Sequence, residues 1–342
     1  MRNILLSPRQ SNWLPLLFAS IFSACGSQPE THIQSKPANV AQQSPEVKIE
    51  PPQPPQRPAI PIATFPQRQR ELYESTGDEY MVVTQGDAAT RAARKMFELG
   101  GNTIDAAAAA SFAIAVERPQ STGIAGGGFL LAYLADRKEM IAVDFREMAP
   151  EKANRDMFLD PQKKQVIADL STDGGLASGV PGMVAGVLSA HEKFGKLDRA
   201  QILQPAIDLA ENGFDVYAHL EAAIAQRKDI LIKSPEALSI FFKDGKADQP
   251  LKVGDKIRQT GLAKVLREIS RLGRDGFYKG WVAKALVEEQ KRQGGLISAK
   301  DLESYEVKYR TAVRGAYGPY EVYSMSPPSS GGVHIVEMLN ID

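Results

Sequence analysis

A proline-rich segment near the N-terminus sets the first limit on what this chain can fold into. Ten of the 22 prolines lie between Pro29 and Pro66, among several glutamines. Proline fixes φ and lacks a backbone N–H, so the run PPQPPQ at residues 51–56 favours extended polyproline structure over helix or central strand. We interpret residues 25–79 as a stiff tether rather than as a ligand for an SH3-like domain. The globular part then covers residues 80–342.

Residues 1–24 have the pattern of an export signal peptide. Two arginines precede an apolar stretch at residues 13–22, which is too short to span a bilayer. Small residues then lead to Cys25, the single cysteine of the chain, which excludes a disulfide within one copy. This arrangement resembles the lipobox of bacterial lipoproteins, with Phe22 where that pattern prefers leucine. We expect an exported protein, periplasmic or at the cell surface, anchored by lipid on Cys25; plain secretion and a wrongly chosen start site are the alternatives.

Composition and motif searches exclude several function classes. The chain has 41 basic and 41 acidic residues and no Lys/Arg-rich block, which argues against nucleic-acid binding. Its four histidines lack metal-ligand spacing, and we expect no metal and no other cofactor. Residues 123–128 are rich in glycine, but the predicted helix before them and strand after them are in the wrong order for a dinucleotide site. We interpret them as a tight turn where the backbone closely approaches another chain or a ligand.

Hydrophobic periodicity predicts alternating helices and strands after residue 80. We expect strands at residues 81–83, 129–135, 140–145, 307–313 and 321–324, with the second and third forming an antiparallel hairpin. We expect helices at residues 86–99, 102–118, 183–194, 205–212, 262–272 and 281–293, the second capped by Asn102 and Asp105. The pattern predicts a layered α+β domain with a buried sheet.

Two segments contain candidates for chemistry. The segment DFREMAP at residues 144–150 places Arg146 at the end of an apolar strand, between two acids. Its guanidinium either forms a salt bridge that fixes the end of the hairpin or grips a ligand carboxylate in two-point geometry, and periodicity does not separate these. The segment PPSSGG at residues 327–332 is either a rigid turn or a functional loop before a helix that begins at Val333.

Together with other segments in the same order, these two resemble the gamma-glutamyltranspeptidases (gamma-glutamyltransferases). The resemblance extends from about Met81 to the last residue. The matching segments are ELGGN (98–102), DAA (105–107), GGGF (126–129), DFREMAP (144–150), VPG (180–182), FYKG (277–280) and PPSSGG (327–332). Two positions differ: Ala125 replaces a usual glycine, and Arg118 stands where histidine is common.

The resemblance implies both a fold and a reaction. The family has the four-layer αββα sandwich of the N-terminal-nucleophile hydrolases, which this chain would contain incompletely. A precursor cuts itself into two subunits, and the N-terminal threonine of the small subunit attacks the gamma-glutamyl amide of glutathione, with its own amino group as base. The glutamyl group then passes to water, an amino acid or a peptide. By this resemblance Arg146 binds the glutamyl α-carboxylate.

The resemblance also implies what this chain lacks. The family's nucleophile follows the large subunit, so we expect it beyond Asp342, and we expect the 342-residue chain alone to be inactive. We also expect a lower soluble yield than for a complete precursor, because half of a sandwich exposes strand edges and an apolar face. Two alternatives remain: a related acylase of cephalosporin-type amides, and a non-catalytic surface lipoprotein that binds glutamyl compounds through Arg146.

Overall fold

The computed structural model describes residues 75–341. The predicted signal peptide, the lipidation site Cys25 and nearly all of the tether lie outside the described residues, so the structure does not bear on them. No helix in the described part is both long enough and apolar enough to cross a bilayer.

The described residues form a helix-rich α+β fold. Its helices are α2 (Asp87–Glu98), α3 (Thr103–Glu117), α4 (Met183–Phe194), α5 (Arg199–Asn212), α6 (Ala218–Gln226), α7 (Lys228–Leu231), α8 (Pro235–Phe241), α9 (Thr260–Leu272), α10 (Asp275–Tyr278), α11 (Gly280–Arg292), α12 (Ala299–Glu303) and α13 (Ser330–Ile341), with 3₁₀ turns at Gly175–Ala177 and Lys243–Gly245. Its strands are β1 (Phe129–Leu134), β2 (Glu139–Asp144), β3 (Phe214–Asp215), β4 (Lys256–Ile257), β5 (Lys308–Arg310), β6 (Val313–Tyr317) and β7 (Tyr320–Ser324).

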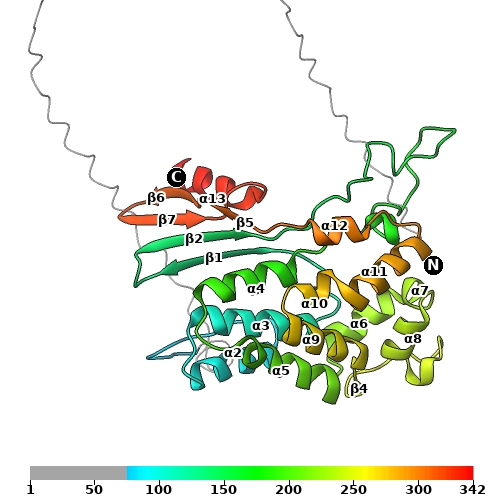
Figure 1. Ribbon diagram of the computed structural model, residues 1–342, viewed down its shortest axis with the longest axis horizontal. Helices are drawn as coiled ribbons and strands as arrows, with labels where there is room; N and C mark the ends of the chain where they lie inside the picture. The colour runs from blue at the N-terminus through cyan, green and yellow to red at the C-terminus, as the bar shows by residue number, and fades with distance from the viewer. Residues whose placement is uncertain (1–74, 342) are drawn as a thin grey trace, which may run out of the picture. The chain divides into compact units, whose positions relative to one another are not determined.

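Four layers follow one another in Figure 1. Helix α13 covers the hairpin β6–β7, which lies over the antiparallel sheet β1–β2–β5. Helix α4 lies on the other face of that sheet, and α3, α2 and α5 lie beyond it. This order confirms the predicted αββα layers.

Helix α3 forms the centre of the main core. Its run of alanines lets neighbouring helices approach closely, and it packs against α2, α4 and α5. Most of its residues are buried, since the helix is apolar all round. A smaller second core lies under α6 and α8, around Leu220, Ile224 and Phe242.

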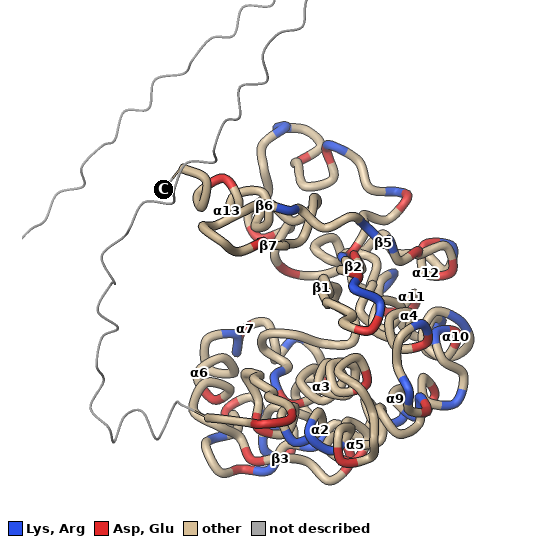
Figure 2. The backbone as a smooth tube through the Cα atoms, turned by 90° about the vertical axis from the view of Figure 1, so that its left-hand side faces the viewer, with Lys and Arg blue, Asp and Glu red and all other residues tan. Residues whose placement is uncertain are grey.

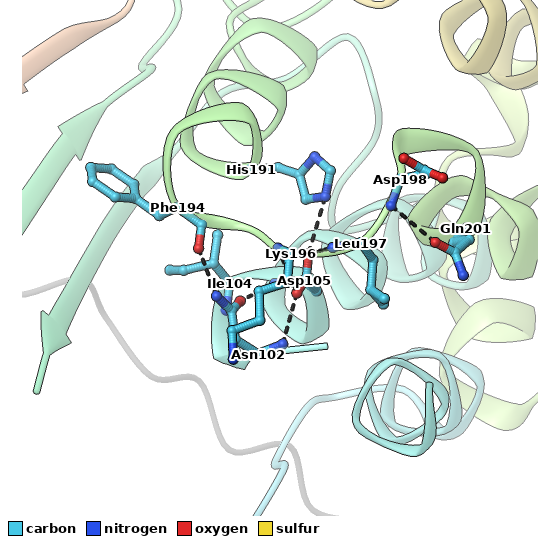
Figure 3. Close-up of polar contacts among 9 residues, drawn as sticks. All are labelled: Asn102, Ile104, Asp105, His191, Phe194, Lys196, Leu197, Asp198 and Gln201. Carbon is cyan, nitrogen blue, oxygen red and sulfur yellow. Dashed lines mark hydrogen bonds and ion pairs between the residues drawn. The ribbon is translucent and has the colours of Figure 1, made fainter. Parts of the chain in front are cut away.

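The N-terminus of α3 is fixed by the predicted capping box. The Asn102 side chain accepts from the backbone N–H groups of Ile104 and Asp105, and the Asp105 carboxylate accepts from the N–H of Asn102 at 2.7 Å. Asp105 is completely buried and also accepts from the N–H groups of Lys196 and Leu197. Figure 3 shows how this one carboxylate joins the start of α3 to the connection between α4 and α5.

His191 lies beside this carboxylate and is also buried. Its Nε2 is 3.1 Å from Asp105 Oδ1, but neither ring nitrogen has a hydrogen-bond partner among the described residues. We therefore regard His191 as a packing residue. The described part of the chain holds no group of three or more His, Cys, Asp or Glu that could bind a metal.

Besides the start of α13, three secondary-structure predictions need correction. Residues 81–83 form no strand, because they have no strand partner and Val83 is 85% exposed. The strand predicted at 307–313 is two strands, β5 and β6, which pair with β2 and β7 in different sheets. Helix α5 begins at Arg199 rather than at Pro205, because Asp198 and Gln201 form a capping box and the helix tolerates the proline.

Charges are spread over the described surface. Lys/Arg and Asp/Glu positions are interspersed along the tube in Figure 2. Many form exposed ion pairs one helical turn apart, such as Arg94 with Glu98 in α2 and Lys279 with Asp275. Such pairs contribute little stability individually.

Candidate functional site

Arg146 lies where the sheet ends and the chain turns out of it. The pairing of β1 with β2 continues beyond Asp144, since Gly128 and Phe145 exchange both backbone hydrogen bonds, at 3.2 and 3.0 Å. The phenyl ring of Phe145 lies in the position that a side chain at Gly186 of α4 would need, so Phe145 faces the helices. Asp144 therefore faces the opposite side of the sheet, and Arg146 follows as an exposed residue.

The hairpin end does contain a salt bridge, but Arg146 does not form it. Asp144 is buried, and its Oδ2 accepts from Arg310 Nε of β5 at 2.8 Å. Its Oδ1 accepts from the backbone N–H of Arg146 at 3.0 Å. Within the described residues the Arg146 guanidinium forms no ion pair. The salt-bridge interpretation of Arg146 is thus wrong for its side chain.

The structure brings together the two segments that the sequence singled out. Arg146 Nη1 donates to the carbonyl oxygen of Pro328 at 3.3 Å, across 182 positions of sequence. Pro328 precedes the start of α13 at Ser330, which is three residues earlier than predicted. The PPSSGG segment therefore borders the side chain that we expect to bind a carboxylate.

The glycine-rich turn at residues 123–128 packs closely against the backbone around Arg146, which belongs to the same chain rather than to another chain or a ligand. A Cβ at Gly127 would lie 2.6 Å from the Phe145 oxygen and 2.7 Å from the Glu147 nitrogen. The Glu147 carboxylate lies against this turn, within 2.8 Å of that same position. The backbone at Arg146 is thus held from one side by a turn that has no room for side chains.

Two buried tyrosines form hydrogen bonds near this site, and one of them bonds the Arg146 backbone. Tyr305 donates its hydroxyl to the Arg146 carbonyl oxygen at 2.9 Å, and Tyr278 donates to the Pro181 carbonyl at 2.8 Å. Their rings stack with centroids 5.9 Å apart. Arg274 donates to the Tyr305 carbonyl and lies 4.7 Å above the Tyr278 ring.

Both tyrosine hydroxyls stay protonated at neutral pH. Burial raises the pKa of Tyr278 above its ordinary value. Burial also raises the pKa of Tyr305, and the negative charges of Asp144 and Glu147 raise it further. A protonated hydroxyl is a donor, which is what the carbonyl oxygens of Arg146 and Pro181 require.

Sequence reasoning missed Tyr305, Arg274 and Arg310. Tyr278 lies in the matching segment FYKG, but no role was predicted for it. An isolated tyrosine or arginine has no sequence signal for a contact with another segment: Tyr305 and Arg310 reach across 159 and 166 positions, and Arg274 across 31. For Arg310 alone, the strand predicted at residues 307–313 indicated that the residue lies in a sheet.

The arrangement can bind an anion. An exposed guanidinium with a fixed backbone presents parallel N–H donors to a carboxylate. Burial of Asp144 and its pairing with Arg310 leave the Arg146 charge available for a ligand. The described site residues supply binding groups; Arg146 itself supplies no nucleophile.

Known proteins with similar sequences come from one family and from related proenzymes. The sequence profile of the family described as Gamma-glutamyltranspeptidase matches residues 89–342. The glutathione hydrolase proenzyme of Escherichia coli (strain K12) is 41% identical over 285 residues, covering 83% of this chain and 48% of that protein. The Acylase ACY 1 proenzyme of Pseudomonas sp. (strain V22) is 37% identical over 287 residues, covering 82% of this chain and 51% of that protein. The chain spans about half the length of these curated relatives.

A solved structure agrees with these sequence relatives. The crystal structure of Helicobacter pylori gamma-glutamyltranspeptidase superposes with a TM-score of 0.75 at 41% sequence identity. The match covers 78% of this chain and 76% of that chain.

Proposed function

Because the chain belongs to the gamma-glutamyltranspeptidase family, we propose that it provides the substrate-binding part of an enzyme that cleaves the gamma-glutamyl amide of glutathione. In this proposal Arg146 binds the α-carboxylate of the glutamyl group. The names of the relatives support the substrate class, since several are glutathione hydrolase proenzymes.

The observation that carries this proposal is the guanidinium of Arg146, which forms no ion pair within the described residues and donates to the Pro328 carbonyl. Arg146 is exposed, and its backbone is held by the Gly127 turn and by the Tyr305 hydroxyl. The acid at the end of the preceding strand, Asp144, forms its ion pair with Arg310. A guanidinium and a carboxylate form two parallel charge-assisted hydrogen bonds, which fix both position and orientation. A glutamyl group held in this way would present its distant amide carbonyl at a constant distance from Arg146.

The proposed reaction is an acyl transfer in two steps. The hydroxyl oxygen of an N-terminal threonine, on a small subunit cut from the same precursor, attacks the amide carbon, and its α-amino group takes the proton. The C–N bond breaks, and the leaving amine receives that proton. Water, an amino acid or a peptide then attacks the resulting ester and releases the threonine hydroxyl.

Substitution of Arg146 tests the binding role. We expect Arg146→Ala, in the protein made from its complete coding sequence, to raise KM for gamma-glutamyl-p-nitroanilide about 100-fold, because two hydrogen bonds to a charged group together contribute about 3 kcal/mol. Arg146→Lys keeps the charge but loses the two-point geometry, so we expect a rise of about tenfold. Arg155→Ala, an exposed arginine in the following loop, is the control and should change KM less than twofold. An unchanged KM in Arg146→Ala would refute the role.

The acylase alternative has a specific observation in its favour, the relative named Acylase ACY 1 proenzyme. A glutaryl amide keeps the carboxylate of the gamma-glutamyl group but lacks its amino group. We expect the wild-type protein to cleave gamma-glutamyl-p-nitroanilide at least tenfold better than glutaryl-p-nitroanilide. Equal rates, or faster cleavage of the glutaryl compound, would favour the acylase.

We also propose that the protein is exported and anchored by lipid on Cys25, as the N-terminal pattern indicates. Lipid on one cysteine with two or more acyl chains gives a stable membrane anchor. Mass spectrometry of the mature N-terminus tests this. A terminus beyond Cys25 without modification would contradict it.

A further inference from the structure

Asp144 lies between two arginines that belong to different parts of the chain. Its Oδ1 accepts from the backbone of Arg146 and its Oδ2 accepts from the side chain of Arg310, at 3.0 and 2.8 Å. The Asp144 side chain is 7% exposed and that of Arg310 is 31% exposed. This carboxylate is therefore largely removed from water, and its charge has one close partner.

The sheet register explains why Arg310 reaches it. In the pairing of β2 with β5, Arg310 lies opposite Ala142 and Lys308 lies opposite Asp144. Residues two apart on a strand point to the same face, so Asp144 and Arg310 share one face of the sheet on a diagonal. Lys308, although directly opposite, forms no ion pair with Asp144.

A buried carboxylate without a partner would compete for the nearest cation. Arg146 is two residues from Asp144, and its backbone is already bonded to that carboxylate. The other neighbouring acid, Glu147, is directed at the Gly127 turn. Asp144 is thus the acid most able to form an ion pair with the Arg146 guanidinium. In the structure Asp144 is paired with Arg310 instead.

We propose that Arg310 is a positioning residue for substrate binding: by neutralising Asp144 it leaves the Arg146 guanidinium free to bind a ligand carboxylate. This inference rests on the proposed role of Arg146 and adds the group that keeps it available. Asp144 then makes two interactions. Its Oδ1 accepts from the Arg146 backbone N–H, and its Oδ2 forms the ion pair with Arg310.

The experiment removes the charge of Arg310 and then removes the charge that it neutralises. In the protein made from its complete coding sequence, Arg310→Gln should raise KM for gamma-glutamyl-p-nitroanilide about tenfold, while kcat changes less than twofold. A second substitution, Asp144→Asn, should then return KM to within about threefold of the wild type. An asparagine can still accept from the Arg146 N–H, but it has no charge to attract the guanidinium.

Matched variants separate charge from folding. Lys308→Gln removes one positive charge from the same strand without touching the Asp144 pair, so KM should change less than twofold. Arg310→Lys keeps the charge and should stay near the wild-type KM even if its melting temperature falls. A purely structural role predicts the opposite for the double variant, because loss of both partners weakens the contact between β2 and β5 further.

The outcomes also separate this inference from the proposed function. If Arg146→Ala raises KM and Arg310→Gln does not, Arg146 binds substrate but Arg310 does not position it. If Arg310→Gln and the double variant raise KM equally, the charge of Asp144 is not the cause, and the proposed positioning role of Arg310 is wrong. If Arg146→Ala leaves KM unchanged, the proposed function fails first and the inference with it.

Discussion

At the scale of single residues, the structure shows why Arg146 is available to a ligand. The sequence places it between two acids, which suggests a salt bridge as readily as a binding site. Both acids are directed elsewhere, one to Arg310 and one to the glycine turn. Among the described residues, the guanidinium hydrogen-bonds to a carbonyl, that of Pro328. A weak neutral acceptor can be exchanged for a carboxylate at little cost.

Tyr305 holds the Arg146 backbone through its hydroxyl, which leads to a prediction. Tyr305→Phe removes the hydroxyl that donates to the Arg146 carbonyl oxygen but keeps the buried ring. We expect a loss of about 1 kcal/mol in the free energy of unfolding, as for an ordinary hydrogen bond. We also expect KM to rise about threefold, measured beside Tyr278→Phe, which loses a bond to Pro181 instead. An equal rise of KM in both variants would show general loosening rather than support of Arg146.

The raised pKa of Tyr305 adds a pH dependence to this prediction. A group whose pKa is higher in the folded protein stabilises the fold below its unfolded pKa, which is about 10 for tyrosine, and loses that contribution as pH rises. Wild-type stability should therefore fall above about pH 10. The fall should be smaller in Tyr305→Phe, as measured by urea unfolding at intervals of about one pH unit from about pH 8 to about pH 11.

At the scale of secondary-structure elements, one carboxylate joins three of them. Asp105 accepts from backbone N–H groups at the start of α3 and between α4 and α5. In Asp105→Asn an NH₂ group replaces one carboxylate oxygen. Because NH₂ is a donor, the backbone N–H groups bonded to that oxygen would lose their acceptor. We expect a loss of about 3 kcal/mol in the free energy of unfolding. Asp208→Asn is the control: it lies exposed on α5, bonds only to Gln204, and should change stability by less than about 0.5 kcal/mol. A similar loss in both variants would contradict the special role of Asp105.

The element scale also shows what the sequence could and could not predict. The capping box of α3, helix α4 and the β1–β2 hairpin were predicted because caps, helical periodicity and a polar turn are local signals. The division of residues 307–313 between two sheets was not, since partner choice depends on distant strands. Arg146 was predicted as a site residue from its motif. Arg310 and Tyr305 were not, because their contacts join segments that are far apart in sequence.

At the scale of the whole molecule, the two sheets have unequal support. The main core is built from residues of α2 to α5, α9 to α12 and β2, with Leu130 of β1 packed against it, and no residue of β6, β7 or α13 belongs to it. The hairpin β6–β7 rests on α13, where Val336 fills the space over Gly315. Helix α13 exposes Ile335, Met338 and Ile341, at 43%, 60% and 85%. These three apolar side chains are exposed within the described part of the chain.

Unequal support predicts unequal local stability. An isolated two-stranded hairpin is marginally stable, and local opening energies range from near zero to the global value. The β1–β2 hairpin is a matched reference, because it is also antiparallel and has a similar number of paired residues. We expect ladder amides of β6–β7 to exchange with deuterium about 100-fold faster than those of β1–β2, which corresponds to about 3 kcal/mol. Mass spectrometry of the exchanged 342-residue protein measures both hairpins in one experiment. Equal protection would mean that the sandwich opens as one unit, and that contacts such as Arg146 with Pro328 hold the second layer as firmly as the core holds the first.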